Sequence, residues 1–246
     1  GPTNNNATTT AATVHEDALN NFNPAFAGTG VEGSQGNNEG GKTTSTTLTY
    51  AMLASLVAFG ADGAGAITLN GNLDGTVATG ITSKGDAVNW DFEAGKVIGV
   101  TNTGRIVFEI TQNTNATASP TDDTYTFTLL DQVDHVTALG DADVSVIVDI
   151  AQAFVATDGD GDSVALENGV AVKIENDVPT WTSAQSGLVS NETGTAFTGD
   201  LNFSIGADEI GLIAFASTNV PPTGLTTASG AAIAYDIDGN VLTAYI

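Results

Sequence analysis

Short runs in which polar and apolar residues alternate are the feature that most limits what this chain can fold into. Four such runs are residues 105–111 (RIVFEIT), 124–130 (TYTFTLL), 144–150 (VSVIVDI) and 169–174 (GVAVKI). Alternation at a period of two puts one set of side chains on each face of a half-buried strand. Amphipathic helical periodicity is nearly absent, with residues 50–59 (YAMLASLVAF) the one ambiguous segment. The sequence predicts an all-β fold of immunoglobulin-like antiparallel β-sandwiches.

The pattern is repeated along the chain. Residues 59–69 (FGADGAGAITL) recur 146 positions later as residues 205–215 (IGADEIGLIAF). Residues 87–93 (AVNWDFE) recur 145 positions later as residues 232–238 (AIAYDID). An almost constant offset predicts tandem domains with a period near 145 residues.

The second copy is shorter than the first. Its counterparts of the runs at 105–111, 124–130 and 144–150 would fall beyond Ile246. Half a sandwich leaves a sheet face and a sheet edge uncovered. We therefore expect the second repeat to be completed by further residues or to be split by an inserted domain.

Four segments follow from the repeat. Residues 1–13 are expected to form a linker or a frayed leading strand. Gly1-Pro2 resembles the remnant of a cleaved expression tag. Residues 14–180 form the complete β-sandwich, residues 181–187 a linker, and residues 188–246 the first part of the second β-sandwich. Pro179 favours an extended backbone at Val178, which stiffens the junction between the copies.

Composition limits the partners. The chain has 246 residues, 29 acidic and 5 basic, for a formal net charge of −24. This charge argues against nucleic acids and anionic membranes, which attract clusters of Lys and Arg, and leaves cations as the simplest partners. The longest apolar run, residues 50–61, is well short of the ~20 residues of a membrane-spanning helix. The chain has no cysteine, so a secreted protein of this kind needs a staple other than a disulfide.

An acidic loop offers such a staple. Asp158, Asp160 and Asp162 alternate with glycines in TDGDGDS, residues 157–163. Converging carboxylates are the ligands that Ca²⁺ prefers, and the cation would convert their mutual repulsion into binding energy. The EF-hand pattern is not met, because Gly169 stands where its twelfth-position glutamate is required. The alternative is a solvated hairpin turn without a metal, since Asp-Gly pairs favour turns.

Further acidic candidates lie near the domain ends. Glu16 and Asp17 open the first copy, Asp177 lies in the junction, and Glu192 opens the second copy. A carboxylate in a stiff junction beside acidic loops is suited to bridging two domains through a shared cation. The alternative for each is a solvated surface charge, and this is the favoured interpretation for the matching residues Asp62 and Asp208.

Two other patterns carry less information. The segment 236–240 (DIDGN) joins two alternating runs, which a β-hairpin explains without a metal. His15 and His135 are the only histidines and Arg105 the only arginine, and no pair of carboxylates is singled out for catalysis. We therefore expect no enzyme activity.

Five short motifs occur in the order found in a known family. They are VHEDALN (14–20), FGADGAG (59–65), YTFTLLDQVDHV (125–136), VATDGDGDS (155–163) and IENDVPT (174–180). In this order they resemble the tandem repeats of giant bacterial adhesins of the repeats-in-toxin (RTX) class. The resemblance covers about residues 14–180 as one repeat and 188–246 as the first part of another. Two departures are the Gly-rich insert at 30–41 and the shortened second copy.

The resemblance implies type I secretion, an extracellular position at the bacterial surface, and Ca²⁺ that rigidifies the repeats. The ligands that it implies are Asp158, Asp160 and Asp162, with Asp177 and Glu192 at the junction. Such repeats usually extend the chain from the cell, while other domains bind sugars, peptides or ice. The expected role is a monomeric structural extender that contacts neighbouring repeats and supports attachment or biofilm formation. The alternatives are a Ca²⁺-dependent module for a glycan or peptide, with Trp90 and Trp181 as the aromatic residues of interest, and a split scaffold for an inserted binding domain.

Overall fold

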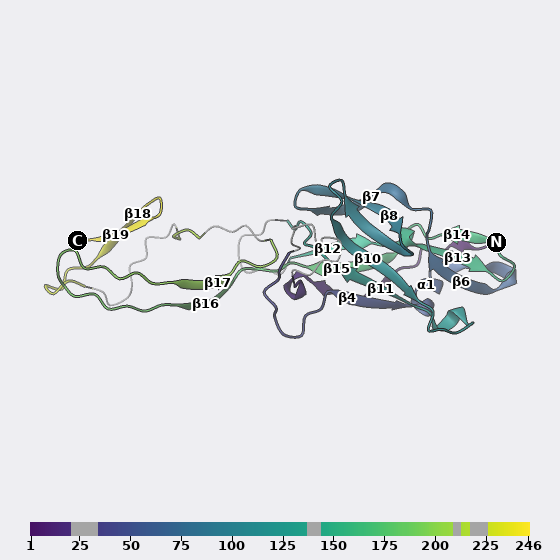
Figure 1. Ribbon diagram of the computed structural model, residues 1–246, viewed down its shortest axis with the longest axis horizontal. Coiled ribbons are helices and arrows are strands. Elements are labelled where there is room, and N and C mark those ends of the chain that lie inside the picture. Colours follow the sequence, from purple (N-terminus) through teal and green to yellow (C-terminus); the bar gives the residue numbers. More distant parts are fainter. Residues whose placement is uncertain (21–33, 137–143, 209–212, 217–225) are drawn as a thin grey trace. The chain divides into compact units, whose positions relative to one another are not determined.

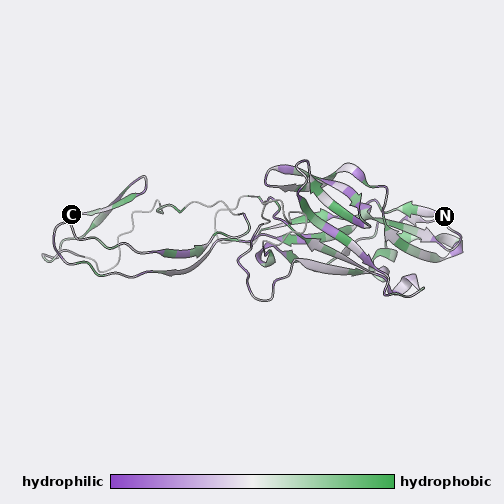
Figure 2. Ribbon diagram, viewed as in Figure 1, coloured by the Kyte–Doolittle hydropathy of each residue, from purple (hydrophilic) through white to green (hydrophobic). Residues whose placement is uncertain are grey.

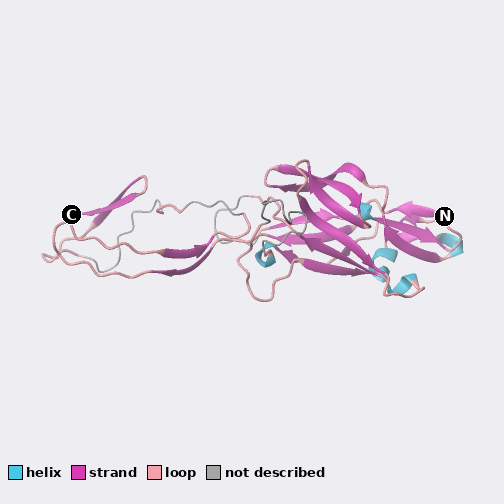
Figure 3. Cartoon of the chain, viewed as in Figure 1, coloured by secondary structure: helices cyan, strands magenta, loops and turns pink. Residues whose placement is uncertain are grey.

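The computed structural model describes residues 1–20, 34–136, 144–208, 213–216 and 226–246. The chain divides into two compact units, Gly1–Glu209 and Ile210–Ile246. The described residues are mostly strands, and helix is limited to a few short turns (Figure 3). All sheets are antiparallel except for two short parallel pairings near the N-terminus. The predicted all-β class is confirmed.

A six-stranded antiparallel sheet forms one layer of the first unit (Figure 1). In β11 the threonines face outward while Tyr125, Phe127 and Leu129 are buried, which is the alternation expected of a half-buried strand. The strands follow the order β4 (Ser45–Thr49), β11 (Thr124–Leu129), β10 (Ile106–Asn113), β9 (Lys96–Thr101), β8 (Asp86–Glu93) and β7 (Asp74–Ser83).

A second sheet is built around β15 (Val170–Glu175). Its antiparallel neighbour is β12 (Ser145–Asp149). The chain start supplies two short parallel partners, β2 (Thr9–Thr10) and β3 (Val14–His15). Residues predicted as a linker or leading strand therefore contribute backbone pairing to the first unit.

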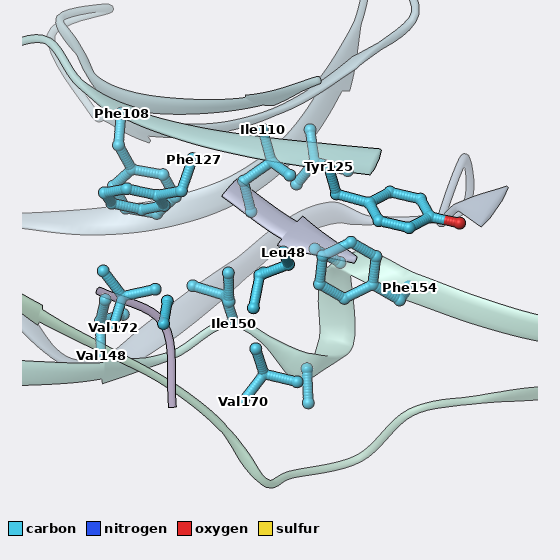
Figure 4. Close-up of a cluster of buried hydrophobic side chains, with 14 of the residues drawn as sticks. Leu48, Phe108, Ile110, Tyr125, Phe127, Val148, Ile150, Phe154, Val170 and Val172 are labelled. Carbon is cyan, nitrogen blue, oxygen red and sulfur yellow. The ribbon is translucent and has the colours of Figure 1, made fainter. Parts of the chain in front are cut away.

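Side chains of these two sheets form the core (Figure 4). Phe108 of β10 stacks on Phe127 of β11 with ring centroids 5.1 Å apart, and Trp90 of β8 meets Phe108 edge-on at 5.3 Å. Val148 of β12 and Val172 of β15 face this aromatic cluster and are fully buried (Figure 4). Apolar residues accordingly concentrate along the strands of the first unit (Figure 2). Two sheets packed face to face in this way form a β-sandwich.

Shorter elements complete the first unit. A three-stranded antiparallel sheet has the order β14 (Ser163–Ala165), β13 (Phe154–Asp158) and β6 (Ala64–Leu69). Two-stranded sheets pair β1 (Thr3–Asn4) with β5 (Val57–Ala58), and β16 (Thr180–Ala184) with β17 (Leu201–Ser204). The 3₁₀ turns are η1 (Glu16–Ala18), η3 (Gly60–Asp62), η4 (Pro120–Asp122) and η5 (Ala151–Ala153).

The ambiguous segment at 50–59 divides between two structures. It begins as helix α1 (Tyr50–Ala54), where the side chain of Thr49 caps the first turn by accepting from the Met52 N–H over 3.3 Å. The chain then leaves the helix and enters β5. Among the described residues, no helix has the length and apolar character needed to cross a membrane.

The described residues of the second unit include an antiparallel hairpin, formed by β18 (Ala234–Asp238) and β19 (Val241–Tyr245). Gly239 in its turn has a φ of +58°, a conformation that favours glycine. The hairpin predicted around residues 236–240 is confirmed.

Candidate metal site

The acidic loop connects two strands of the three-stranded sheet. β13 ends at Asp158 and β14 begins at Ser163, and Thr157 pairs with Ser163 across the hairpin. On its other side β13 pairs with β6, where Asp158 lies opposite Ala64 after an irregularity in the ladder. The turn η3, which ends at Asp62, immediately precedes β6. The sheet therefore brings the loop and η3 to the same edge.

Asp158 is the fixed member of the loop. Its Oδ1 accepts hydrogen bonds from the backbone N–H groups of Asp162 (2.9 Å) and Gly161 (3.2 Å). Its side chain is completely buried, and Oδ2 has no hydrogen-bond partner among the described residues. A buried carboxylate oxygen without a donor is costly unless a cation or a proton satisfies it. The orientation of Asp158 therefore favours a bound cation at Oδ2.

Asp62 and Asp160 supply two further carboxylates. One oxygen from each of Asp62, Asp158 and Asp160 lies within 4.8 Å of the other two, although Asp62 and Asp160 are exposed. Within the described ranges this is the one group of three or more acidic or histidine side chains that comes so close together. A donor set made only of oxygens suits Ca²⁺, which takes six to eight of them, the remainder from carbonyls and water.

Glycines allow the loop to lie close to η3. The Gly159 N–H donates to the Gly63 carbonyl over 3.1 Å, and a Cβ at Gly159 would clash with the carbonyl oxygen of Asp62. Gly161 has a φ of +102°, outside the range that other residues commonly adopt. The glycines between the aspartates therefore have structural reasons beyond turn preference.

The loop carboxylates influence one another's protonation. Burial alone would raise the pKa of Asp158, but the neighbouring Asp160 carboxyl group and backbone N–H groups outweigh it and lower that pKa. The interaction with Asp158, including repulsion between the two carboxylates, raises the pKa of Asp160. Without a cation, the carboxylate of the pair that binds a proton more readily is therefore Asp160 rather than Asp158. A divalent ion would replace that proton and favour the ionised form of both.

Asp162 has a different position from the one that the sequence predicts. Its backbone N–H supports Asp158, but its carboxylate is 67% exposed and lies outside the group of three. The N-terminal ammonium of Gly1 lies 3.6 Å from Asp162 Oδ2 and 3.9 Å from Asp158 Oδ2.

A second acidic cluster, made of Glu16, Asp17 and Asp177, is buried near the predicted junction. Glu16 Oε1 accepts from the Val133 N–H over 2.6 Å. Asp177 Oδ2 accepts from the N–H groups of Asn37 (2.8 Å) and Ala207 (3.0 Å). Asp177 therefore ties Ala207 to Asn37, two residues that are far apart in the sequence.

Burial dominates the protonation of this cluster. It raises the pKa of Glu16 well above its ordinary value, and repulsion from Asp208 and Asp177 adds to the effect. Burial likewise raises the pKa of Asp177 to about 6, with a further contribution from a hydrogen bond and repulsion from Asp17. Lys42 is a nearby cation, with Nζ 3.9 Å from Asp17 Oδ2. Among the described residues, the carboxylate oxygens of this second cluster do not come as close together as those of Asp62, Asp158 and Asp160.

Glu192 and the two tryptophans lie apart from both clusters, whereas His135 borders the second one, with its Nδ1 3.7 Å from Glu16 Oε2. Glu192 lies in an exposed turn, where its carbonyl accepts from the Thr195 hydroxyl over 2.9 Å. The ring nitrogens of His135 contact the carbonyls of Val133 (2.9 Å) and Ile174 (3.2 Å). Trp90 is buried in the core, whereas Trp181 is 60% exposed.

The interpretation of Asp62 as a solvated surface charge missed its proximity to Asp158. The signal available in the sequence was the recurrence of the GAD motif at residues 60–62 and 206–208, which does not reveal that β6 pairs with β13.

Comparison of the chain with protein-family models, curated proteins and solved structures gave no match.

Proposed function

We propose that this chain is a calcium-stapled structural segment of a secreted bacterial adhesin, in which Asp62, Asp158 and Asp160 hold the ion. The observation that carries the proposal is the buried Asp158 Oδ2, which has no hydrogen-bond partner among the described residues and belongs to a group of three carboxylates. The ion joins η3 to the β13–β14 hairpin and so replaces the disulfide that this cysteine-free chain lacks.

The extender role rests on the repeat and the charge. Tandem copies and a net charge of −24 suit a chain that keeps its surface solvated and stiffens where cations are abundant. Extracellular Ca²⁺ at millimolar concentration would load a site that is empty in the cytosol, which couples folding to export. Neighbouring repeats in the same polypeptide are the partners in this proposal, and catalysis has no part in it.

Thermal unfolding in Ca²⁺ and in excess EDTA tests the metal site. At a Ca²⁺ concentration of about 100 times Kd the native state gains ~2.7 kcal/mol, which raises Tm by roughly 5–10 °C for a unit of this size. Mg²⁺ at the same concentration is the control, since its smaller octahedral shell fits an open carboxylate group less well. An unchanged Tm in EDTA would overturn the proposal.

An exposed aromatic pair favours ligand binding as the second candidate function. Trp181 pairs with Phe203 across β16 and β17, and the two side chains are 60% and 39% exposed. Aromatic rings on a strand surface provide stacking area for a sugar or a peptide side chain. A glycan and peptide array probed in Ca²⁺ with the chain and with Trp181→Ala distinguishes the two functions, because a plain extender binds nothing on it.

A further inference from the structure

Residues 34–42, which include the described part of the Gly-rich insert, lie against the second acidic cluster. Gly36 makes the closest approach, because a Cβ there would overlap the backbone carbonyl oxygens of Glu16 and Asp17. The Asn38 N–H donates to the same Asp17 carbonyl over 2.7 Å. We call residues 34–42 the donor segment. Its backbone is packed against the turn η1 that carries two of the buried acids.

Asn37 of the donor segment contacts both oxygens of the Asp177 carboxylate. Its backbone N–H donates to Asp177 Oδ2 over 2.8 Å, and its Nδ2 donates to Oδ1 over 2.6 Å. The Ala207 N–H donates to the same Oδ2 over 3.0 Å. A carboxylate offers about four lone-pair positions, so three donors take most of them. Little of the Asp177 carboxylate therefore remains to coordinate a metal ion.

The two ends of the donor segment reach two other buried carboxylates. At one end, Ser34 donates from Oγ to Asp131 Oδ1 over 2.6 Å. At the other end, Lys42 places Nζ 3.9 Å from Asp17 Oδ2 and 2.6 Å from Glu175 Oε1. A single short segment thus supplies hydroxyl, amide and ammonium donors to carboxylates from separate parts of the chain.

The two acidic clusters differ in which buried oxygens lack a partner. Among the described residues, Asp158 Oδ2 in the acidic loop is the one fully buried carboxylate oxygen without a hydrogen-bond partner. Beside Asp177, the oxygens without a partner are those of the Asn37 and Asn176 amides, which are neutral. An unpaired charged oxygen costs more than an unpaired neutral one. The need for a cation therefore lies at the acidic loop.

We propose that the donor segment takes the place of a metal ion at the cluster of Glu16, Asp17 and Asp177, so that the chain itself holds these buried acids together. The resemblance to adhesin repeats instead implies Asp177 and Glu192 as Ca²⁺ ligands, and neither fits, because Glu192 lies in an exposed turn. The proposal does not depend on the calcium site at the acidic loop.

Asn37→Asp in the full chain tests the proposal, because it exchanges a donor for a second carboxylate against Asp177. The matched control is Asn38→Asp, which makes the same change of charge at the next residue, where the side chain is exposed. Both are made in a parent chain that carries Asp158→Asn and Asp160→Asn, which removes most of the acidic-loop site. The readout is Tm in Ca²⁺ and in excess EDTA.

For the parent chain, we expect Tm in Ca²⁺ and in EDTA to agree within about 2 °C, since the cluster already has its donors. Asn37→Asp should lower Tm in EDTA by roughly 5–15 °C, and Ca²⁺ should restore about half of the loss or more. Asn38→Asp should lower Tm by less than about 2 °C in either solution.

Lys42→Met is the second variant, in case Asn37→Asp does not fold. It removes the ammonium group beside Asp17 and should lower Tm in EDTA by roughly 2–5 °C, a loss that Ca²⁺ should reduce. A Lys42→Met chain with the Tm of its parent in EDTA would contradict the proposal.

Two other results would overturn the proposal. One is an equal Tm for Asn37→Asp and Asn38→Asp in EDTA. The other is a rise in the Tm of the parent chain with Ca²⁺ that disappears on Asp177→Asn, because it would place a cation in the cluster beside an intact donor segment. A wild-type chain whose Tm ignores Ca²⁺ would overturn the proposed function alone, since the comparison of Asn37→Asp with Asn38→Asp does not involve the acidic loop.

Discussion

Arg105 donates a hydrogen bond from Nη1 to Oδ2 of Asp131 over 2.8 Å, and the Asp131 carboxylate is completely buried. Arg105 is the only arginine of the chain. Its Nη2 also donates to the carbonyl of Ser83 at the end of β7 over 2.8 Å. The guanidinium thus joins the beginning of β10 to the end of β7 and neutralises a buried charge.

Arg105→Met is expected to lower the free energy of unfolding by about 3–5 kcal/mol, because it leaves Asp131 charged and buried without its main partner. The matched control is Lys96→Met, which removes a 2.6 Å ion pair with Glu109 from a lysine that is 43% exposed. That change should cost about 1 kcal/mol or less. Urea unfolding at neutral pH measures both, and equal losses would contradict the role assigned to Arg105.

Much of this fold could be predicted because its strands alternate at period two. The runs at 105–111, 124–130, 144–150 and 169–174 correspond to β10, β11, β12 and β15. The parallel pairing of Thr9–Thr10 and Val14–His15 with β15 could not be predicted, because segments of two residues are too short to show a periodicity of their own. Their strand conformation comes from hydrogen bonds to a distant partner.

The candidate site could be predicted only in its local part. Asp158 and Asp160 are neighbours in a turn whose glycines are visible in the sequence. Asp62 joins them through the pairing of β6 with β13, a contact between segments about ninety residues apart. The equal spacing of the three loop aspartates also conceals that Asp162 supplies a backbone donor while its side chain lies outside the group.

The aspartates of the loop should differ in their effect on Ca²⁺ affinity. Asp158→Asn removes the charge of the buried ligand and is expected to weaken Ca²⁺ binding by at least about tenfold. Asp162→Asn keeps the backbone N–H that supports Asp158, and its exposed carboxylate should matter by less than about threefold. Isothermal titration calorimetry measures both, and a reversed order would place the ion nearer Asp162 than Asp158.

Gly159→Ala tests the close approach of the loop to η3. The new Cβ would collide with the Asp62 carbonyl oxygen, and relief of this clash must move Asp62 away from Asp158. We expect a loss of about 1–3 kcal/mol in stability and a smaller Ca²⁺-dependent rise in Tm. Gly40→Ala is the control, because a Cβ there meets no atom within 4 Å. An unchanged Ca²⁺ response in Gly159→Ala would show that Asp62 is not a ligand.

The buried pair Asp17 and Asp177 should make stability depend on pH when EDTA is present. The pKa of Asp177 rises from 3.8 to about 6 on folding, so the folded state favours its protonated form. The resulting stability is complete below about pH 4 and is lost as pH rises through about 6, a loss of at most ~3 kcal/mol.

Asp17→Asn should remove only part of this loss, because burial is the largest cause of the raised Asp177 pKa and stays in place, while the amide removes the smaller contributions that Asp17 makes. We expect the variant to exceed the wild type by about 1 kcal/mol or less at pH 7.5 and to match it near pH 4. Urea unfolding across this range measures the difference, with the exposed Asp200→Asn as the control for net charge. A difference that stays constant with pH would show that Asp17 does not control the protonation of Asp177.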